Sequence, residues 1–489
     1  MRLPTSLARA RRTRRLRGAI ATAATAAAAV LAGAGCFRDG SLNVDPNRST
    51  SADASQLFTG ATVKFSLLRV GELTWPVALS TQMWASGGRW GLAQAQYDQT
   101  RIRSAWGSIY VDVLKNLLLA TREAEALTPR PNNTIAQLKI YTAFVYSQTT
   151  YLWGDIPFTE AATGEVDFPK FDRQEVVLDG TIRLLDEALA LVDASSARIG
   201  APADLYYGGD MARWRRFANS LKLRILMSMV DAAPAKAQAI AAMQGQPMIA
   251  SRADEMKFPY LNQPGRQNPR FSFTAIFRGG VQQDWYASDV VFREMQPLAD
   301  PRLPVFFQPG PGASAADGFV ALNSVESFSP RASLVNMALL RPDLPEVSFS
   351  LSEQLLLEAE AIARGFWPGG VAAADTRYRA GVRENMSALG VAPAAIERYV
   401  NALPALTAAN ARTELNRQQW LDLFMRPLEA WVQWRRSGPI GQEYPAMRVP
   451  QGAATGGLVR RLLYRSEEIN SNPNTPAGLL QDAPLWFDK

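Results

Sequence analysis

The strongest constraint on the fold is a helical spacing of apolar residues that recurs along most of the chain. Between residues 132 and 153, steps of three, four and seven separate the apolar positions Ile135, Leu138, Tyr141, Val145 and Leu152. This spacing places the five side chains on one face of an α-helix. Residues 106–127 show a similar pattern and end before two prolines, which stop a helix. Together the two segments predict a helical hairpin.

The same pattern predicts three further hairpins, at 174–192 with 210–230, at 350–389 and at 393–436. Helix pairs too small to bury their own apolar faces indicate stacked repeats of the tetratricopeptide kind. We therefore expect an all-α fold of about four hairpins. Residues 245–349 lose this periodicity and are rich in proline, glycine, asparagine and aromatics. A stretch of that length is expected to hold short strands or helices and to contribute to a binding face.

The first 35 residues have the character of an export signal. They carry seven arginines and no acidic residue, followed by an alanine-rich apolar run that is too short for a convincing membrane span. Small residues precede Cys36, the only cysteine, as a lipoprotein signal peptidase requires, although Gly33 stands where a large aliphatic residue is usual. We predict that residues 1–35 are a signal peptide and that Cys36 is the lipidated N-terminus. The alternative is a free cysteine after an ordinary signal peptide.

After the leader, residues 36–55 are polar and turn-prone and predict a tether, and residues 56–489 predict a single domain. The whole chain carries a net charge of +7, and the leader contributes seven arginines, so residues 36–489 have no net charge. Without a net positive charge or a run of lysines and arginines, these residues lack the main electrostatic attraction for nucleic-acid phosphates. Nucleic-acid binding is therefore excluded.

The residue inventory also excludes several kinds of chemistry. Histidine is absent and Cys36 is alone, so zinc sites built on histidine or cysteine, Ser-His-Asp triads, Cys-His dyads and structural disulfides cannot form. No dinucleotide fingerprint, phosphate loop or EF-hand loop occurs. We predict no catalytic residues, no cofactor and no dedicated metal site, and leave open whether a calcium ion binds.

Three glutamates lie close together on one predicted helix, namely Glu353, Glu358 and Glu360. Two of them could be mistaken for the catalytic acid pair of a glycosidase. Glycoside hydrolysis needs two carboxyl groups that face each other across a cleft. Neighbours along one helix rarely do so. We predict structural or solvated roles for all three, and a chain that is not an enzyme.

Two aromatic segments are candidates for ligand binding. The first contains Trp84, Arg89, Trp90 and Tyr97 around a glycine-rich turn, and the second contains Trp285 and Tyr286. Flat aromatic faces cover the C–H face of a sugar, while arginine and amide groups bond its hydroxyls. The alternative for both segments is packing in the core, because large aromatic side chains are highly buried on average.

Several segments, in order, give the chain a family resemblance. They are Leu42–Asn47 after Cys36, Trp106–Tyr110, Trp153–Pro157, Gly209–Asp210 with Trp214, Asn219–Arg224, Asp300–Leu303, Leu357–Ala361, Glu429–Arg436 and Tyr464–Asn470. In these the chain resembles the SusD/RagB-like outer-membrane lipoproteins over nearly its whole mature length. The resemblance implies one α-helical domain of four tetratricopeptide-like hairpins with irregular segments packed on one side.

The resemblance also implies a function. Members of that family capture glycans without cleaving them, sit over a SusC-like TonB-dependent β-barrel transporter, and often draw ligand contacts from both aromatic segments. We therefore expect a surface-exposed protein, held in the outer membrane by lipid on Cys36, that captures oligosaccharides for import. The alternatives are peptide capture for uptake of the same type and a glycoside hydrolase on a helical scaffold.

Overall fold

The computed structural model describes residues 53–86, 102, 104–162, 166–278, 284–322, 329–450, 453 and 455–489. The predicted leader, Cys36 and most of the tether lie outside these residues, as do Arg89, Trp90 and Tyr97. Residues Asp53–Lys489 form one compact unit, which is mostly helical with two small sheets, and this confirms the predicted fold class. None of the helices in these ranges combines the length and apolar character needed to cross a bilayer.

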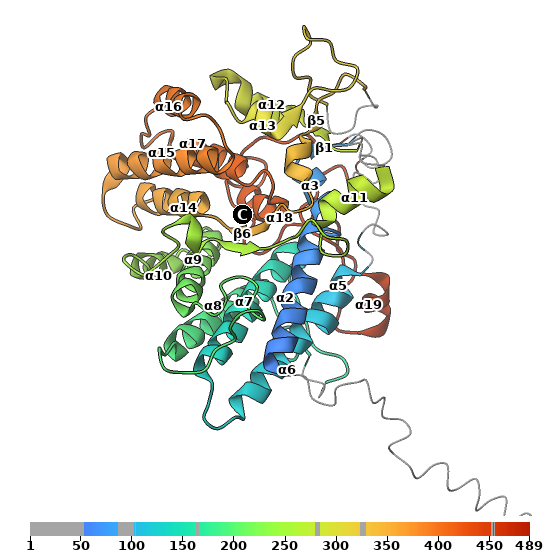
Figure 1. Ribbon diagram of the computed structural model, residues 1–489, viewed down its shortest axis with the longest axis vertical. Coiled ribbons are helices and arrows are strands. Elements are labelled where there is room, and N and C mark those ends of the chain that lie inside the picture. The colour runs from blue at the N-terminus through green and yellow to red at the C-terminus, as the bar shows by residue number, and fades with distance from the viewer. Residues whose placement is uncertain are drawn as a thin grey trace, which may run out of the picture. The chain divides into compact units, whose positions relative to one another are not determined.

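The N-terminal part of the unit is a layer of long helices (Figure 1). Its members are α2 (Ala54–Val70), α5 (Ala105–Ser108), the π-helix η2 (Ile109–Leu114), α6 (Lys115–Glu125), α7 (Asn132–Trp153), α8 (Gln174–Leu191), α9 (Met211–Met229) and α10 (Lys236–Ala242). Helix α6 packs on α7 as the predicted hairpin requires. However, α6 makes its most extensive contacts with α2, and α7 makes its most extensive contacts with α8. The predicted hairpin is therefore packed more closely against the adjacent helices than within itself.

The C-terminal part contains α14 (Leu351–Ala363), α15 (Gly370–Ala388), α16 (Pro393–Ala402), α17 (Ala411–Asp422) and α18 (Pro427–Arg435). The first two form the predicted hairpin, and the Ser350 side chain begins it by accepting a hydrogen bond from the Glu353 amide. The segment 393–436 is three helices where one pair was expected. Proline explains the break between α17 and α18, because Pro427 is the first residue of α18. Proline is tolerated at a first helical position, but it lacks the N–H group needed to continue the preceding helix.

The irregular stretch holds the short elements that its composition predicts. They are η3 (Arg252–Asp254), β2 (Met256–Phe258), α11 (Pro269–Arg278), β3 (Tyr286–Ala287), α12 (Asp289–Met295), η4 (Gln296–Leu298), α13 (Leu303–Phe306), β4 (Phe307–Gln308), β5 (Leu334–Val335), η5 (Met337–Leu340) and β6 (Glu346–Phe349). One antiparallel sheet has the order β1-β3-β5-β4, with β1 at Trp84–Ala85, and a second pairs β2 with β6. Figure 1 shows β1 and β5 near α3 (Thr74–Ser80) and α11.

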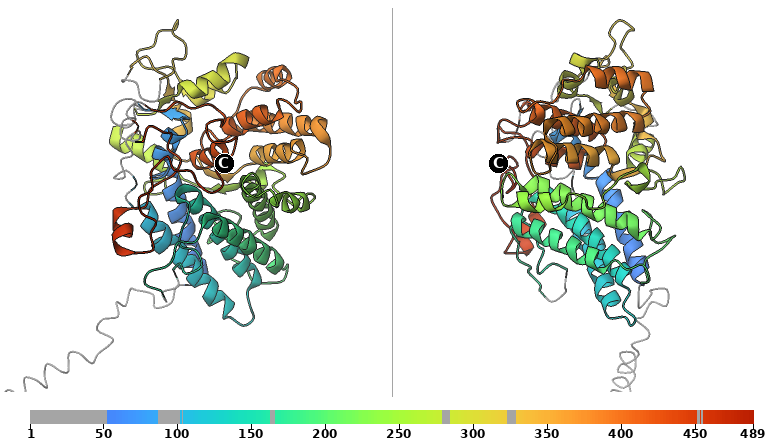
Figure 2. Two further views of the ribbon diagram at one scale, coloured as in Figure 1. Left: turned by 180° about the vertical axis from the view of Figure 1, so that it is seen from behind. Right: turned by 90° about the vertical axis from the view of Figure 1, so that its left-hand side faces the viewer.

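The core is continuous from the first described helix to the C-terminus. One cluster of buried apolar side chains extends from Phe58 on α2 to Phe487, and a second lies among α14, α15, α16 and α17. In the view from behind in Figure 2 (left), the chain between α18 and α19 (Ser466–Ser471) crosses in front of the N-terminal helices. On this path the Leu462 amide donates to the Leu152 carbonyl at the end of α7. The C-terminal segment therefore packs against the N-terminal helices and is hydrogen-bonded to the end of α7.

Candidate ligand-binding face

The fold brings the two predicted ligand-binding segments together. Strands β1 and β3 pair antiparallel, with Trp84 opposite Ala287 and Ala85 opposite Tyr286. Because residues opposite each other in an antiparallel pair have Cβ atoms roughly 5 Å apart, the start of each segment lies beside the other. Regions about two hundred residues apart in the sequence are thus neighbours in one sheet.

The side chains of the two segments that the structure describes are buried. The side chains of Trp84 and Trp285 are both 0 % exposed, and Tyr286 is 2 % exposed. Burial, with the nearby Asp284 carboxylate adding to it, raises the pKa of Tyr286 to about 12. The burial of these three side chains favours the packing alternative, and direct ligand contact stays a prediction. Trp84 packs on Trp285 and Phe424, which are distant in the sequence.

Trp84 and Trp285 are the inner members of an aromatic cluster whose outer members are Trp75 on α3 and Phe273 on α11. The Trp75 and Trp285 rings stack with centroids 4.4 Å apart and planes 4° apart, and Trp84 lies 5.8 Å from Trp75. Phe273 lies 5.3 Å from Trp75 and 6.0 Å from Trp285. Offset and tilted pairs at these distances hold the rings rigidly. Sequence reasoning missed Trp75, although Glu72 and Thr74 are polar neighbours, because the short segment around it lacks the glycine-rich, amide-rich composition that marked the two predicted segments.

An open hollow of about 370 Å³ lies outside this cluster, with Trp75 and Phe273 in its wall. Its other lining residues are Leu67, Gly71, Glu72, Gly265, Gln267, Pro269 and Ser272. Trp75 is 8 % exposed, whereas Phe273 is only partly buried. The hollow combines aromatic surface with a carboxylate, an amide and a hydroxyl, which is the mixture that binds a polyhydroxylated ligand.

Comparison with known proteins now identifies the family. Residues 46–464 match the SusD-like family, which is described as starch-binding and associating with the outer membrane. The chain belongs to the SusD-like family. No curated protein sequence matches it.

Solved structures agree with this family at the level of the fold. A chitin-binding protein superposes with a TM-score of 0.77 at 23% sequence identity, covering 89% of this chain and 100% of its own. A SusD/RagB family protein from Bacteroides thetaiotaomicron has a TM-score of 0.75 at 18% identity, covering 90% and 99%. A SusD homologue from Bacteroides fragilis has a TM-score of 0.71 at 18% identity, covering 90% and 100%.

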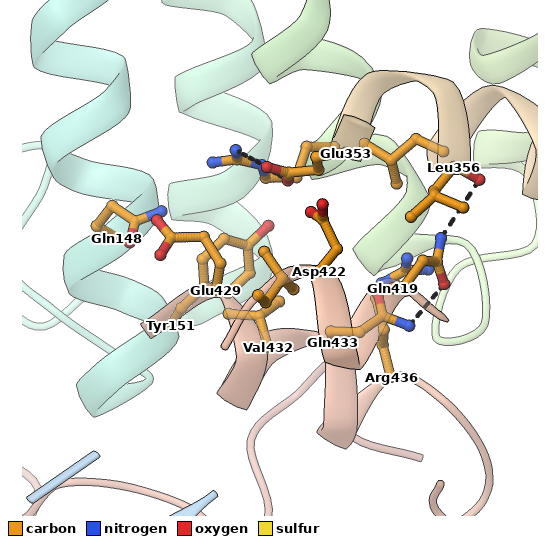
Figure 3. A pocket seen from close by; sticks show the side chains of 13 residues that line it. Gln148, Tyr151, Glu353, Leu356, Gln419, Asp422, Glu429, Val432, Gln433 and Arg436 are labelled. Atoms are coloured by element: carbon orange, nitrogen blue, oxygen red, sulfur yellow. Dashed lines mark hydrogen bonds and ion pairs between the residues drawn. The ribbon is translucent and has the colours of Figure 1, made fainter. Parts of the chain in front are cut away.

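A separate small cavity in this SusD-like chain, between α14 and α17, lacks the volume to hold a nutrient. Its volume is about 30 Å³, and Figure 3 shows Asp422 pointing toward Glu353 across it, with Gln148 beside Glu429. Two of its lining atoms, Arg224 Nη1 and Glu429 Oε2, have no hydrogen-bond partner among the described residues. The size and polar lining suit a single buried water.

The three glutamates singled out in the sequence are held by cations. Glu353 accepts hydrogen bonds from Arg224 at 2.7 and 2.9 Å and also pairs with Arg426. Glu360 accepts from Arg436 at 2.9 and 2.8 Å, and Glu358 pairs with Arg377 at 2.9 Å. Burial raises the pKa of Glu358. All three lie on α14 and none lines the hollow at Trp75 and Phe273. Glu353 faces the Asp422 carboxyl group only across the cavity of about 30 Å³.

Proposed function

We propose that this chain is a lipid-anchored binding protein of the outer membrane that captures glycans for import through a partner TonB-dependent, SusC-like transporter. Its ligand is bound and released unchanged. The observation that carries the proposal is the pairing of β1 with β3 beside an aromatic-walled hollow, in a family described as starch-binding. A relative of the same fold described as chitin-binding supports the same class of ligand.

In this proposal the ligand contacts the hollow at Phe273 together with Arg89, Trp90 and Tyr97, which follow β1 in the sequence and lie outside the described residues. These three residues supply a guanidinium and two aromatic rings. Sugars exchange hydrogen bonds with water for hydrogen bonds with protein at little net gain, so the affinity of one site is modest and release is fast. Fast release suits delivery to a transporter.

The anchor in this proposal is the acylated Cys36. The two or three acyl chains of a bacterial lipoprotein hold it stably, because each buried methylene contributes about 0.8 kcal/mol. In the proposal, residues 36–55 are the predicted tether that joins this anchor to the helical unit. Replacing Cys36 by serine is expected to move the chain from the outer-membrane fraction to the soluble fraction.

The test is calorimetric titration of the full chain in detergent against starch-derived and chitin-derived oligosaccharides and against peptides. We expect saturable glycan binding without hydrolysis, weakened about tenfold by Phe273→Ala and by Trp90→Ala. Leu127→Ala is the matched control, because Leu127 is 58% exposed and lies outside every hollow described above. Thermal melts establish that each variant folds.

Each other outcome contradicts a defined part of the proposal. Binding of peptides alone would overturn the glycan assignment and leave capture for import. Appearance of shorter saccharides during the titration would show that the chain is an enzyme. A Phe273→Ala variant that folds and binds as tightly as the unaltered chain would move the site away from the hollow.

A further inference from the structure

A second hollow, of about 360 Å³, opens on the N-terminal helices between η2, the loop before α8 and α19. This volume falls within the range of small-molecule sites, roughly 300–1,000 Å³. Aromatic residues Trp106 and Tyr110 and the prolines Pro157 and Pro169 line it. It takes no part in the binding face described above.

The floor of this hollow is fixed in place. The Trp106 indole donates to Glu468 at 3.0 Å, and its ring lies 4.9 Å from Tyr110 and 5.3 Å from Trp153. The Tyr110 hydroxyl donates to the Pro157 carbonyl at 2.9 Å. The floor therefore joins three of the segments that carry the family resemblance, 106–110, 153–157 and 464–470, which are far apart in the sequence.

Two backbone irregularities border the same hollow. Tyr110 and Val111 lie on the π-helix η2, and Ala162, another lining residue, has a φ of 54°. π-helical turns occur frequently at functional sites. A left-handed conformation is uncommon for a residue other than glycine, and such residues gather at ligand sites, where the surroundings hold them.

The rim presents groups that the fold itself does not use. Phe168 is 53% exposed, and its loop is held by Asn474, which donates to the Phe168 carbonyl at 2.8 Å. Lys115 and Asp167 also line the hollow, and neither makes an ion pair or side-chain hydrogen bond with any residue in the described part of the chain. An exposed aromatic face beside an ammonium and a carboxylate provides stacking together with donors and acceptors for hydroxyl groups.

We propose that this second hollow is a carbohydrate subsite, in which a pyranose ring packs on Phe168 while Lys115 and Asp167 bond its hydroxyls. This inference rests on the proposed glycan capture and extends it to a second contact. The floor comes from segments that resemble the family, whereas Phe168, Lys115 and Asp167 lie outside those segments. A shared scaffold with independent rim residues is the arrangement expected where related binding proteins take different sugars.

Hydrogen bonds link the walls of the two hollows, and the proposal has one long glycan contact both. Glu72 lines the first hollow, and its carboxylate accepts hydrogen bonds from the amides of Ser104 and Ala105, at 2.7 and 3.1 Å. These two residues directly precede Trp106, which lines the second hollow. A ligand that engages both makes its second contact intramolecularly, which raises affinity for long chains above that for short ones.

The test titrates the full chain in detergent with a disaccharide and with a long oligosaccharide of the same sugar, malto- and chito-series both being used. Phe168→Ala and Asp167→Ala are expected to weaken binding of the long oligosaccharide about threefold to tenfold. They should leave binding of the disaccharide, which occupies the first hollow, unchanged. Leu127→Ala, equally exposed, is the control and should change neither.

The possible failures are distinct. If the unaltered chain binds neither sugar series, the proposed function fails and the subsite fails with it. If Phe273→Ala weakens the long oligosaccharide but Phe168→Ala and Asp167→Ala do not, the subsite is overturned and glycan capture stands. If Phe168→Ala leaves sugar affinity unchanged but weakens capture of the copurified β-barrel transporter, the hollow is a protein-docking surface instead.

Discussion

At the scale of single residues, burial separates side chains that look equivalent in the sequence. The structural role predicted for Glu360 agrees with its two hydrogen bonds from Arg436 and a third from Gln419 at 2.8 Å. The role of Trp84 could not be decided from its neighbours in the sequence, because the rings of Trp285 and Phe424 also pack against it. Local sequence shows what a side chain can do, whereas distant elements decide whether solvent reaches it.

Glu360→Gln tests the buried ion pair through pH. Burial alone would raise the pKa of Glu360, but Arg436 and Arg364 outweigh burial and hold this pKa at about 2. The unfolded carboxyl binds its proton near pH 4.3, so the pair stabilises the fold above that pH and its contribution is lost as pH falls toward 2. We expect the variant to lose about 3–5 kcal/mol of unfolding free energy at pH 7, because Arg436 stays buried without its partner.

Urea unfolding of both proteins at pH 7, 5 and 3 measures this effect. The difference between them should shrink at pH 3, and a difference that is the same at all three pH values would contradict the assignment. Glu467→Gln is the control. Glu467 pairs with Arg465 at the surface, and its removal should leave stability unchanged.

At the scale of elements, local sequence signals such as apolar spacing, caps and helix breakers determine most helix positions. The predicted segments 132–153 and 174–192 correspond to Asn132–Trp153 and Gln174–Leu191. Such boundaries are local, because caps and helix breakers act on adjacent residues, as Asp210 does by accepting from the Ala212 and Arg213 amides at the start of α9. The π-helix η2 was not predicted, since an extra residue in one turn leaves the apolar spacing of 106–127 almost unchanged.

Gly381→Ala tests the packing of α15 on α14. A Cβ atom at Gly381 would lie 2.8 Å from Cγ of the buried Leu356, so we expect a loss of about 1–3 kcal/mol through overpacking. Gly60→Ala is the matched control within a helix. No atom lies within 4 Å of its added Cβ, so the higher helix propensity of alanine should stabilise the chain by about 0.5–1 kcal/mol. Equal effects of the two substitutions in thermal melts would contradict close packing at Gly381.

At the scale of the whole molecule, Arg69 joins elements from both ends of the compact unit. From α2 it pairs with Glu346 on β6 and, at 2.8 Å, with Glu429 on α18, and it donates to Gln148 on α7 at 2.8 Å. Burial opposes its charge, but the two carboxylates raise the pKa of Arg69 well above its ordinary value. The guanidinium thus stays charged and links four elements.

Arg69→Ala is expected to cost about 3–5 kcal/mol, because it leaves two buried carboxylates without their cation. Since one apolar cluster extends from Phe58 to Phe487, the variant should still unfold in a single calorimetric transition, at a lower Tm. Two separate transitions would show that the N-terminal and C-terminal helices are independent. Arg341→Ala removes an exposed pair with Asp343 and should change stability by less than about 1 kcal/mol.

The sequence by itself determined the all-α class, most helix positions, the family, and the chemistries that a chain without histidine cannot perform. These properties depend on composition and on short-range spacing, both of which can be read directly from the sequence. Only the tertiary structure decided that β1 pairs with β3 and that Trp75 and Phe273 line a hollow while Trp84 and Trp285 do not. It also decided that residues from 106–110, 153–157 and 464–470 meet at a second hollow. Burial and convergence depend on contacts between distant segments, and no local pattern encodes those contacts.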